Sequence, residues 1–178
     1  MNKNNIILIG MMGAGKSTIG KKLQQELSEY AFIDVDEYIE KKSGMKIPEI
    51  FEKFSEQEFR KRETEAIIEL CNENNQIVAT GGGAFENITN RKVLLSSGTI
   101  FYLFAPPEVL YDRIKIDGNR PMLFCENPQK IFNDLFTKRD KNYRKADFII
   151  DTTNLTVEDS VKEILRRGYA NGDNSRNT

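Results

Sequence analysis

The stretch "GMMGAGKST", residues 10–18, follows directly on the apolar run "NIILI" of residues 5–9. Four of its residues match the pattern G-x-x-x-x-G-K-[ST], and these are Gly10, Gly15, Lys16 and Ser17. Glycines allow a backbone to wrap around a phosphate with its N–H groups turned inward. The next residues, "KSTIGKKLQQEL" (16–27), carry apolar side chains at helical spacing. The sequence therefore predicts a strand, a phosphate-binding loop and a helix in succession.

The pattern also assigns a chemical role to each part of this loop. The N-terminus of the following helix carries partial positive charge and favours a phosphate. Lys16 can reach the β- and γ-phosphates, and the Ser17 hydroxyl can bind Mg²⁺. The residues expected to contact ATP here are Gly13, Ala14, Gly15, Lys16, Ser17 and Thr18. A plain glycine-rich turn with a solvated lysine is the alternative, and the strand–loop–helix setting favours the nucleotide interpretation.

Length and composition limit the remaining possibilities. The 178 residues and the formal net charge of −1 are typical of one compact domain without a nucleic-acid surface. We expect one domain over 1–168, followed by a polar, disordered tail over 169–178. No apolar run approaches the ~20 residues of a membrane span, and no signal peptide is evident, so we expect a cytoplasmic protein. Cys71 and Cys125 are isolated, and we expect both thiols to be reduced.

The chain contains no histidine. This excludes nucleophile systems that depend on histidine and zinc sites with histidine ligands. The chemistry must use carboxylates, lysine, arginine, backbone amides and a bound ion. Phosphoryl transfer suits this set, because it depends mainly on positioning and on charge stabilisation.

Apolar runs alternate with helical patterns along the chain. The runs read as strands at 5–9, 31–34, 76–80, 99–104 and 146–150. Helices are expected over 16–28, about 47–72, 89–96, 107–116, 128–142 and 156–167. The runs are continuously apolar, as in parallel strands covered on both faces. The sequence therefore predicts an α/β three-layer fold of the P-loop NTPase type, with a five-stranded parallel sheet and helices on both faces.

Ligands of such sheets bind at the carboxyl ends of the strands, so the residues there are the candidates for a site. "DVD" follows the second strand, and on sequence alone we interpret Asp36 first as an N-cap of the helix "EYIEKKS". Asp34 closes an apolar strand beside the expected phosphate loop. "GGG" (81–83) follows the third strand, which suggests a backbone that approaches a ligand closely.

Three arginines lie in less decisive surroundings. Arg60 in "EQEFRKRE" and Arg139 in "TKRDKNYRK" belong to highly charged helices, where a solvated position is the usual expectation. Arg120 lies in a turn-rich segment at about 115–127 without a clear period. A connection of this length suggests a lid that could close an arginine over the phosphates.

Taken in order, these segments resemble the shikimate kinase family over about 5–165. The matching segments are "GMMGAGKST", "FIDVDEYIE", "EQEFRKRE", "ATGGGAF", "NRPML" and "KRDKNYR". The phosphate loop is shared by many proteins, whereas the ordered set is far more specific. Two departures are the Met of "RPML", where the family usually has Leu, and "DTTNLTVED", which matches the adenine side poorly.

On the acceptor side, the resemblance implies a pocket for shikimate. Asp36 is implied to hold ring hydroxyls, and Arg60 and Arg139 to clamp the carboxylate. The backbone of Gly81, Gly82 and Gly83 is implied to line that pocket.

On the donor side, the resemblance implies ATP as co-substrate and Mg²⁺ as cofactor. Lys16 and Arg120 are implied to stabilise the transferring phosphoryl group. Ser17 is implied to serve Mg²⁺ directly and Asp34 through water, while Arg113 is a looser match for a residue flanking adenine. The expected partners are the two small substrates, with no nucleic acid and no membrane, and we expect a monomer.

Two alternatives stay open from the sequence. One is another small-molecule P-loop kinase, either of the gluconate type or acting on nucleoside monophosphates. The other is a regulatory module that binds ATP without turnover.

Overall fold

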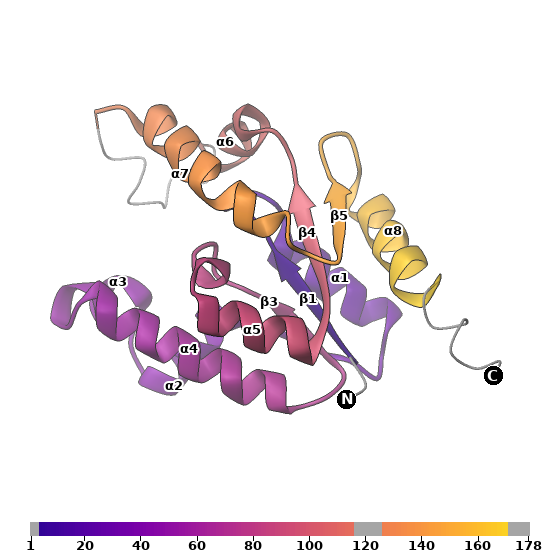
Figure 1. Cartoon of the computed structure of the whole chain (residues 1–178), viewed down its shortest axis with the longest axis horizontal. Helices are drawn as coiled ribbons and strands as arrows, with labels where there is room; N and C mark the ends of the chain where they lie inside the picture. Colours follow the sequence, from indigo (N-terminus) through magenta and orange to yellow (C-terminus); the bar gives the residue numbers. More distant parts are fainter. Residues whose placement is uncertain (1–3, 116–125, 171–178) are drawn as a thin grey trace.

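The computed structural model describes residues 4–115 and 126–170, and these contain a five-stranded parallel sheet flanked by helices (Figure 1). The strands are β1 (Asn5–Ile9), β2 (Ala31–Asp34), β3 (Gln76–Ala79), β4 (Gly98–Phe104) and β5 (Phe148–Asp151). The helices are α1 (Lys16–Glu26), α2 (Val35–Ser43), α3 (Ile47–Lys53), α4 (Glu56–Asn72), η1 (Ala84–Glu86), α5 (Ile88–Ser97), α6 (Pro107–Lys115), α7 (Pro128–Tyr143) and α8 (Val157–Ala170). The predicted α/β fold is confirmed.

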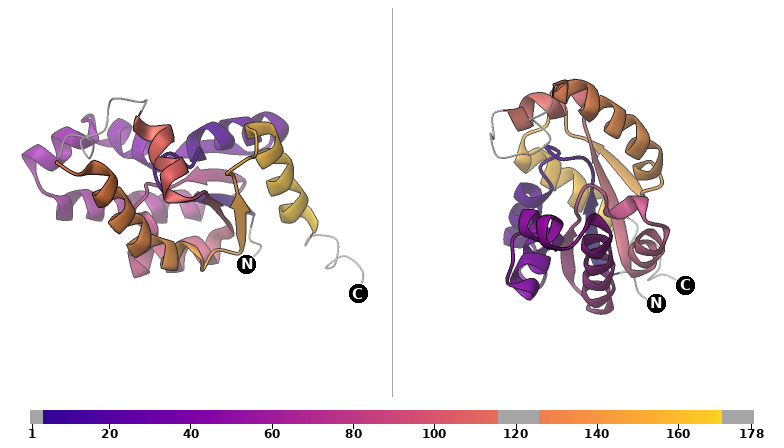
Figure 2. Two further views of the ribbon diagram at one scale, coloured as in Figure 1. Left: turned by 90° about the horizontal axis from the view of Figure 1, so that it is seen from above. Right: turned by 90° about the vertical axis from the view of Figure 1, so that its left-hand side faces the viewer.

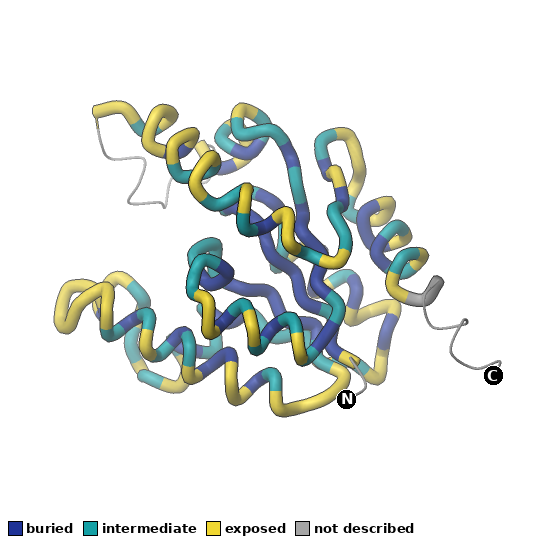
Figure 3. Tube along the Cα trace, viewed as in Figure 1, coloured by how far each residue is buried: buried dark blue, intermediate teal, exposed yellow. Residues whose placement is uncertain are grey.

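The first strand of the chain is the central strand of the sheet. The strand order is β2-β3-β1-β4-β5, and β1 pairs in parallel with β3 at Ile7↔Val78 and with β4 at Ile7↔Ile100. Ile7, Leu8 and Ile9 are fully buried, and the buried positions follow the strands through the middle of the molecule (Figure 3). Burial on both faces explains why "NIILI" shows no polar alternation.

The helices form a layer on each side of this sheet (Figure 2). Because successive side chains of a strand point to opposite faces, β4 identifies the two layers. Phe101 faces α8, where an added Cβ at Gly168 would lie 3.5 Å from its ring. Tyr102 points to the other face, and its ring centroid lies 5.0 Å from that of Tyr143 in α7. Thus α8 and α7 lie on opposite faces.

The carboxyl ends of all five strands meet at one edge, and the phosphate loop leaves the sheet there. Gly10 has φ 146°, a region that L side chains rarely adopt. A Cβ at Gly10 would also lie 2.7 Å from the Leu103 carbonyl oxygen of β4. The chain can therefore turn out of the sheet beside β4 only with glycine at this position.

One helix expected from the sequence is two helices in the structure. The expectation of a single helix over about 47–72 is wrong, because α3 ends at Lys53 and α4 begins at Glu56. Ser55 lies between them in extended conformation, and its Oγ accepts a hydrogen bond from Glu58 N at 3.2 Å. The serine therefore acts as an N-cap that starts a new helix.

Two other expectations concern cysteines and membrane spans. Cys71 is half-buried and free, whereas Cys125 lies outside the described residues. Within 4–115 and 126–170, every helix is too short or too polar to cross a bilayer.

Gly98 provides a test of the close contact between the central strands. It begins β4 opposite Asn5 of β1, and an added Cβ would lie 2.8 Å from the Asn5 carbonyl carbon. Since that atom belongs to the backbone, Gly98→Ala must push the strands apart, and we expect the free energy of unfolding to fall by about 1–3 kcal/mol. Gly168→Ala is the matched control, because its Cβ would meet only the Phe101 ring at 3.5 Å. Urea unfolding of both variants measures the difference, and an unchanged midpoint for Gly98→Ala would contradict the expectation.

Candidate active site

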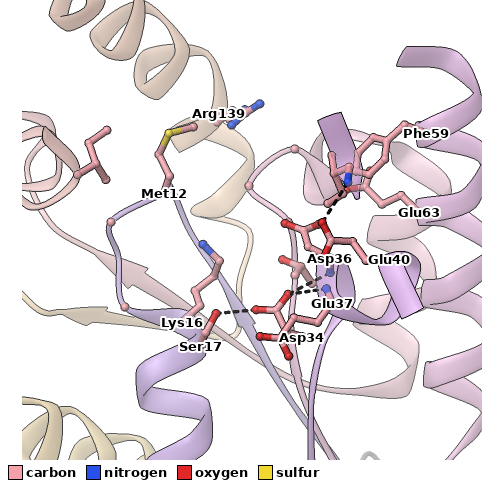
Figure 4. A pocket seen from close by; sticks show the side chains of 18 of the residues that line it. Met12, Lys16, Ser17, Asp34, Asp36, Glu37, Glu40, Phe59, Glu63 and Arg139 are labelled. Atoms are coloured by element: carbon pink, nitrogen blue, oxygen red, sulfur yellow. Dashed lines mark hydrogen bonds between the residues drawn. The ribbon is translucent and has the colours of Figure 1, made fainter. Parts of the chain in front are cut away.

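A cavity of about 750 Å³ opens at the carboxyl edge of the sheet. Its volume lies in the range of small-molecule sites. Its charged lining residues are Lys16, Asp34, Asp36, Glu37, Glu40, Arg60, Glu63, Arg113 and Arg139. The structure thus brings together residues from the phosphate loop, α2, α4, α6 and α7 that lie far apart in the sequence (Figure 4).

The phosphate loop holds its lysine against its own backbone. Lys16 Nζ donates to the carbonyl oxygens of Gly10 and Met11, at 2.9 and 3.0 Å. Helix α1 starts at Lys16, and Gly15 at its N-terminus offers no side-chain cap to the first N–H groups. Uncapped N–H groups and the positive end of the helix dipole favour an anion at this place. The loop therefore has the geometry that the sequence pattern predicts.

Asp34 joins the end of β2 to the start of α1 and also caps α2. Ser17 Oγ donates to Asp34 Oδ2 at 2.6 Å (Figure 4). The other carboxylate oxygen of Asp34 accepts from the N–H groups of Asp36 and Glu37, at 3.0 and 3.4 Å. The interpretation of Asp36 as the N-cap is therefore wrong. Because Asp34 caps the helix, the Asp36 carboxylate is left to line the cavity.

The Ser17–Asp34 pair fits a magnesium ion. A hydroxyl and a carboxylate are hard oxygen donors, the kind that Mg²⁺ prefers. The described part of the chain holds no group of three or more Asp, Glu, Cys or His side chains that could bind a metal by themselves. This also suits Mg²⁺, which usually keeps several waters and takes further ligands from substrate phosphates.

Two carboxyl groups in the cavity have raised pKa values. Burial, together with the Asp34 carboxylate, raises the pKa of Asp36, although Lys16 acts in the opposite direction. Burial also raises the pKa of Glu63, against the effect of the Arg60 guanidinium. Both groups therefore bind a proton more readily than an ordinary carboxylate does.

Glu63 is a site residue that the sequence reasoning missed. Its side chain is 1% exposed, and its Oε2 lies 3.0 Å from Arg60 Nη1. Glu56 contacts the other Nη atom of Arg60 at 3.3 Å. The spacing in the sequence indicates this ion pair, because Arg60 and Glu63 are three residues apart and share one face of α4. The carboxylates of Glu63 and Glu56 together hold the Arg60 guanidinium group at the cavity.

The triple glycine after β3 allows the charged side chains to pack against its backbone. An added Cβ at Gly82 would lie 3.2 Å from Arg139 Nη1. One at Gly83 would lie 2.7 Å from Arg60 Nη1, and the first glycine has a similar contact with Asp36. Any larger residue here would displace one of these groups. The expected solvated position is therefore wrong for Arg60 and Arg139, which both line the cavity.

A second hollow of about 350 Å³ adjoins the phosphate loop. Its lining residues are Gly13, Ala14, Gly15, Thr18, Ile19, Arg113, Thr152, Leu155, Thr156, Val157 and Ser160. Arg113 borders both cavities and donates to the carbonyl oxygen of Thr152 at 2.8 Å. Arg120 and the greater part of the expected lid lie outside the described residues.

Comparison with known proteins agrees with this geometry. The profile of the family described as "Shikimate kinase" matches residues 12–168. The shikimate kinases of Thermodesulfovibrio yellowstonii and Caldanaerobacter subterraneus subsp. tengcongensis are 45% and 42% identical, over 91% of this chain and 93% and 94% of theirs. The structure of the Acinetobacter baumannii shikimate kinase in complex with shikimate superposes with a TM-score of 0.89 at 41% identity, covering 96% of this chain and 95% of that one. The chain belongs to the shikimate kinase family.

Proposed function

We propose that this chain transfers the γ-phosphoryl group of ATP to a hydroxyl group of shikimate. The observation that carries the proposal is one cavity bordered by both the phosphate loop and the pair Arg60 and Arg139. A donor anion and a carboxylate acceptor can therefore occupy neighbouring parts of the same space. The named activity of the relatives supports the same substrates.

The donor side consists of the phosphate loop and the arginine beside it. Lys16, now bonded to Gly10 and Met11, would turn to the phosphates and stabilise the charge on the transferring group. Arg113 and the hollow next to Thr152 would receive the base. Arg120 remains a proposal as a second cation at the transferring group.

The acceptor side consists of the two guanidinium groups and the carboxylate of Asp36. Arg60 and Arg139 present planar forks of N–H donors, which suit a carboxylate better than a point charge does. Asp36 can accept hydrogen bonds from ring hydroxyls. The backbone of residues 81–83 lies between these groups and gives the acceptor a wall without side chains.

Ser17 and Asp34 would hold Mg²⁺, Ser17 directly and Asp34 through water. When bound, the ion would neutralise charge on the phosphates of the nucleotide. In the structure the two side chains already lie within one hydrogen bond of each other. Their oxygens therefore need little rearrangement to face the same ion.

Because the chain has no histidine, we propose that an aspartate handles the proton of the acceptor hydroxyl. A loose, metaphosphate-like transition state asks little of a base, so orienting the acceptor hydroxyl can suffice. The raised pKa of Asp36 makes its carboxylate a better proton acceptor than an ordinary aspartate.

The proposed activity is tested by coupled ADP release from purified protein with shikimate, gluconate or nucleoside monophosphates as acceptor. We expect ADP release only when shikimate is the acceptor. Lys16→Ala should lower kcat by orders of magnitude, because the transferring group loses its positive partner. Release with another acceptor, or ATP binding without any turnover, would favour one of the two alternatives. Near-normal kcat in Lys16→Ala would contradict the role of the loop.

Arg139 is tested by substitution with alanine and with lysine. Charge-assisted hydrogen bonds to a carboxylate contribute about 1.5–3 kcal/mol, so Arg139→Ala should lower kcat/KM for shikimate roughly 10- to 100-fold. Arg139→Lys should restore only part of this loss, because an ammonium group lacks the planar fork. The Kd for ATP alone should stay unchanged. Lys138→Ala, an exposed neighbour on α7, is the control. A loss confined to ATP binding would remove Arg139 from the acceptor site.

Asp34→Asn tests the magnesium site without removing the helix cap. The asparagine oxygen can still accept from the N–H groups of α2, but the negative charge is gone. We expect the Mg²⁺ concentration for half-maximal activity to rise roughly tenfold. Asp151→Asn is the control, because this carboxylate also ends a strand and accepts from Thr153 N at 2.9 Å. An equal Mg²⁺ requirement in both variants would count against Asp34.

A further inference from the structure

Tyr143 is a buried residue that contacts the site from outside the cavity. It is the last residue of α7 and is 1% exposed. Its hydroxyl donates a hydrogen bond to the Gly82 carbonyl oxygen. It also lies four residues after Arg139, on the same face of the helix. Both side chains approach Gly82, where an added Cβ would lie 3.2 Å from Arg139 Nη1 and 3.8 Å from Tyr143 Oη.

The carbonyl group of Gly82 is bonded differently from those of Gly81 and Gly83. The Gly81 carbonyl accepts from Ala84 N at 3.1 Å, and the Gly83 carbonyl accepts from Glu86 N at 3.1 Å. Both of these bonds lie within the turn itself. The Gly82 carbonyl, between them, is bonded by a side chain from α7.

The bond to the Gly82 carbonyl also orients the next N–H group of the chain. In a planar trans peptide, the Gly82 C=O and the Gly83 N–H point in opposite directions, so the bond to Tyr143 sets the direction of that N–H. Gly83 lines the cavity and packs against Arg60. A single hydroxyl therefore orients backbone that lies beside both guanidinium groups.

The Tyr143 hydroxyl also contacts the phosphate loop. Tyr143 Oη and Arg139 Nη1 each lie 3.9 Å from the Met11 sulfur. Burial raises the pKa of Tyr143, against the opposing effect of Arg139, so the hydroxyl keeps its proton and stays a donor. The end of α7, the triple glycine and the phosphate loop meet at this group.

We propose that Tyr143 is a positioning residue for the acceptor. Its hydroxyl holds Arg139 and the glycine backbone in the arrangement that receives the carboxylate of shikimate, and it does not touch the substrate. This inference rests on the proposed function and adds to it a residue that acts through Arg139 and Gly82.

Tyr143→Phe removes the hydroxyl and keeps the ring that packs on Tyr102. We expect the KM for shikimate to rise about three- to tenfold, as for the loss of one or two hydrogen bonds. The kcat should change less than about twofold, and the Kd for ATP should stay the same. Calorimetric titration with shikimate measures the same ratio without turnover.

Tyr102→Phe is the matched control. Tyr102 is equally buried, and its hydroxyl donates to Asp140 Oδ1 at 2.8 Å on the same helix, away from the cavity lining. It should lower stability about as much as Tyr143→Phe and leave the KM unchanged. An unchanged KM in Tyr143→Phe, or an equal rise in both variants, overturns the inference. Wild-type protein that shows no shikimate-dependent turnover overturns the proposed function as well.

Discussion

Parallel pairing of β1 with both β3 and β4 determines where every charged group of the site can lie. Because the three strands end at the same edge, the loops that follow them lie close together. Glycine residues allow this close packing in two places. Gly10 lets the phosphate loop leave the sheet against the backbone of β4, and the glycines at 81–83 let side chains from α2, α4 and α7 approach the backbone of the neighbouring loop.

The two arginines that line the cavity beside the triple glycine, Arg60 and Arg139, are held in different ways. Arg60 contacts the carboxylates of Glu63 and Glu56, and Glu63 is removed from water. Removing charges from water is costly, and the mutual attraction and hydrogen bonds of the pair offset this cost. Arg139 instead rests between the glycine backbone, the Met11 sulfur and Tyr143. Arg60 thus contacts two carboxylates directly, whereas Arg139 contacts backbone and a sulfur atom and interacts with Glu63 only at longer range.

The sequence predicts the sheet well because parallel strands covered on both faces must be apolar, and the phosphate loop well because its spacing is demanded by backbone geometry. It predicts the boundary residues less well. Asp34 and Asp36 have the same chemistry and lie two residues apart, so only the actual start of α2 decides which one caps the helix. Ser55 is a cap within a continuous helical pattern, and the pattern outweighed it.

Glu63 and Tyr143 differ in how far a sequence pattern can indicate their contacts. The spacing of Arg60 and Glu63 along one helix face indicates an ion pair, although not its burial, whereas the partner of Tyr143 is a carbonyl group far away in the sequence, which no local pattern records.

The central position of β1 has a consequence for how the protein is made. Ile7 is synthesised well before its neighbours in the sheet, which are Val78 and Ile100. The central strand must therefore remain unpaired until β3 has been synthesised, and it gains its second neighbour only when β4 follows. During that interval an apolar strand with open edges is exposed to other chains, a condition that favours aggregation and gives chaperones a place to bind.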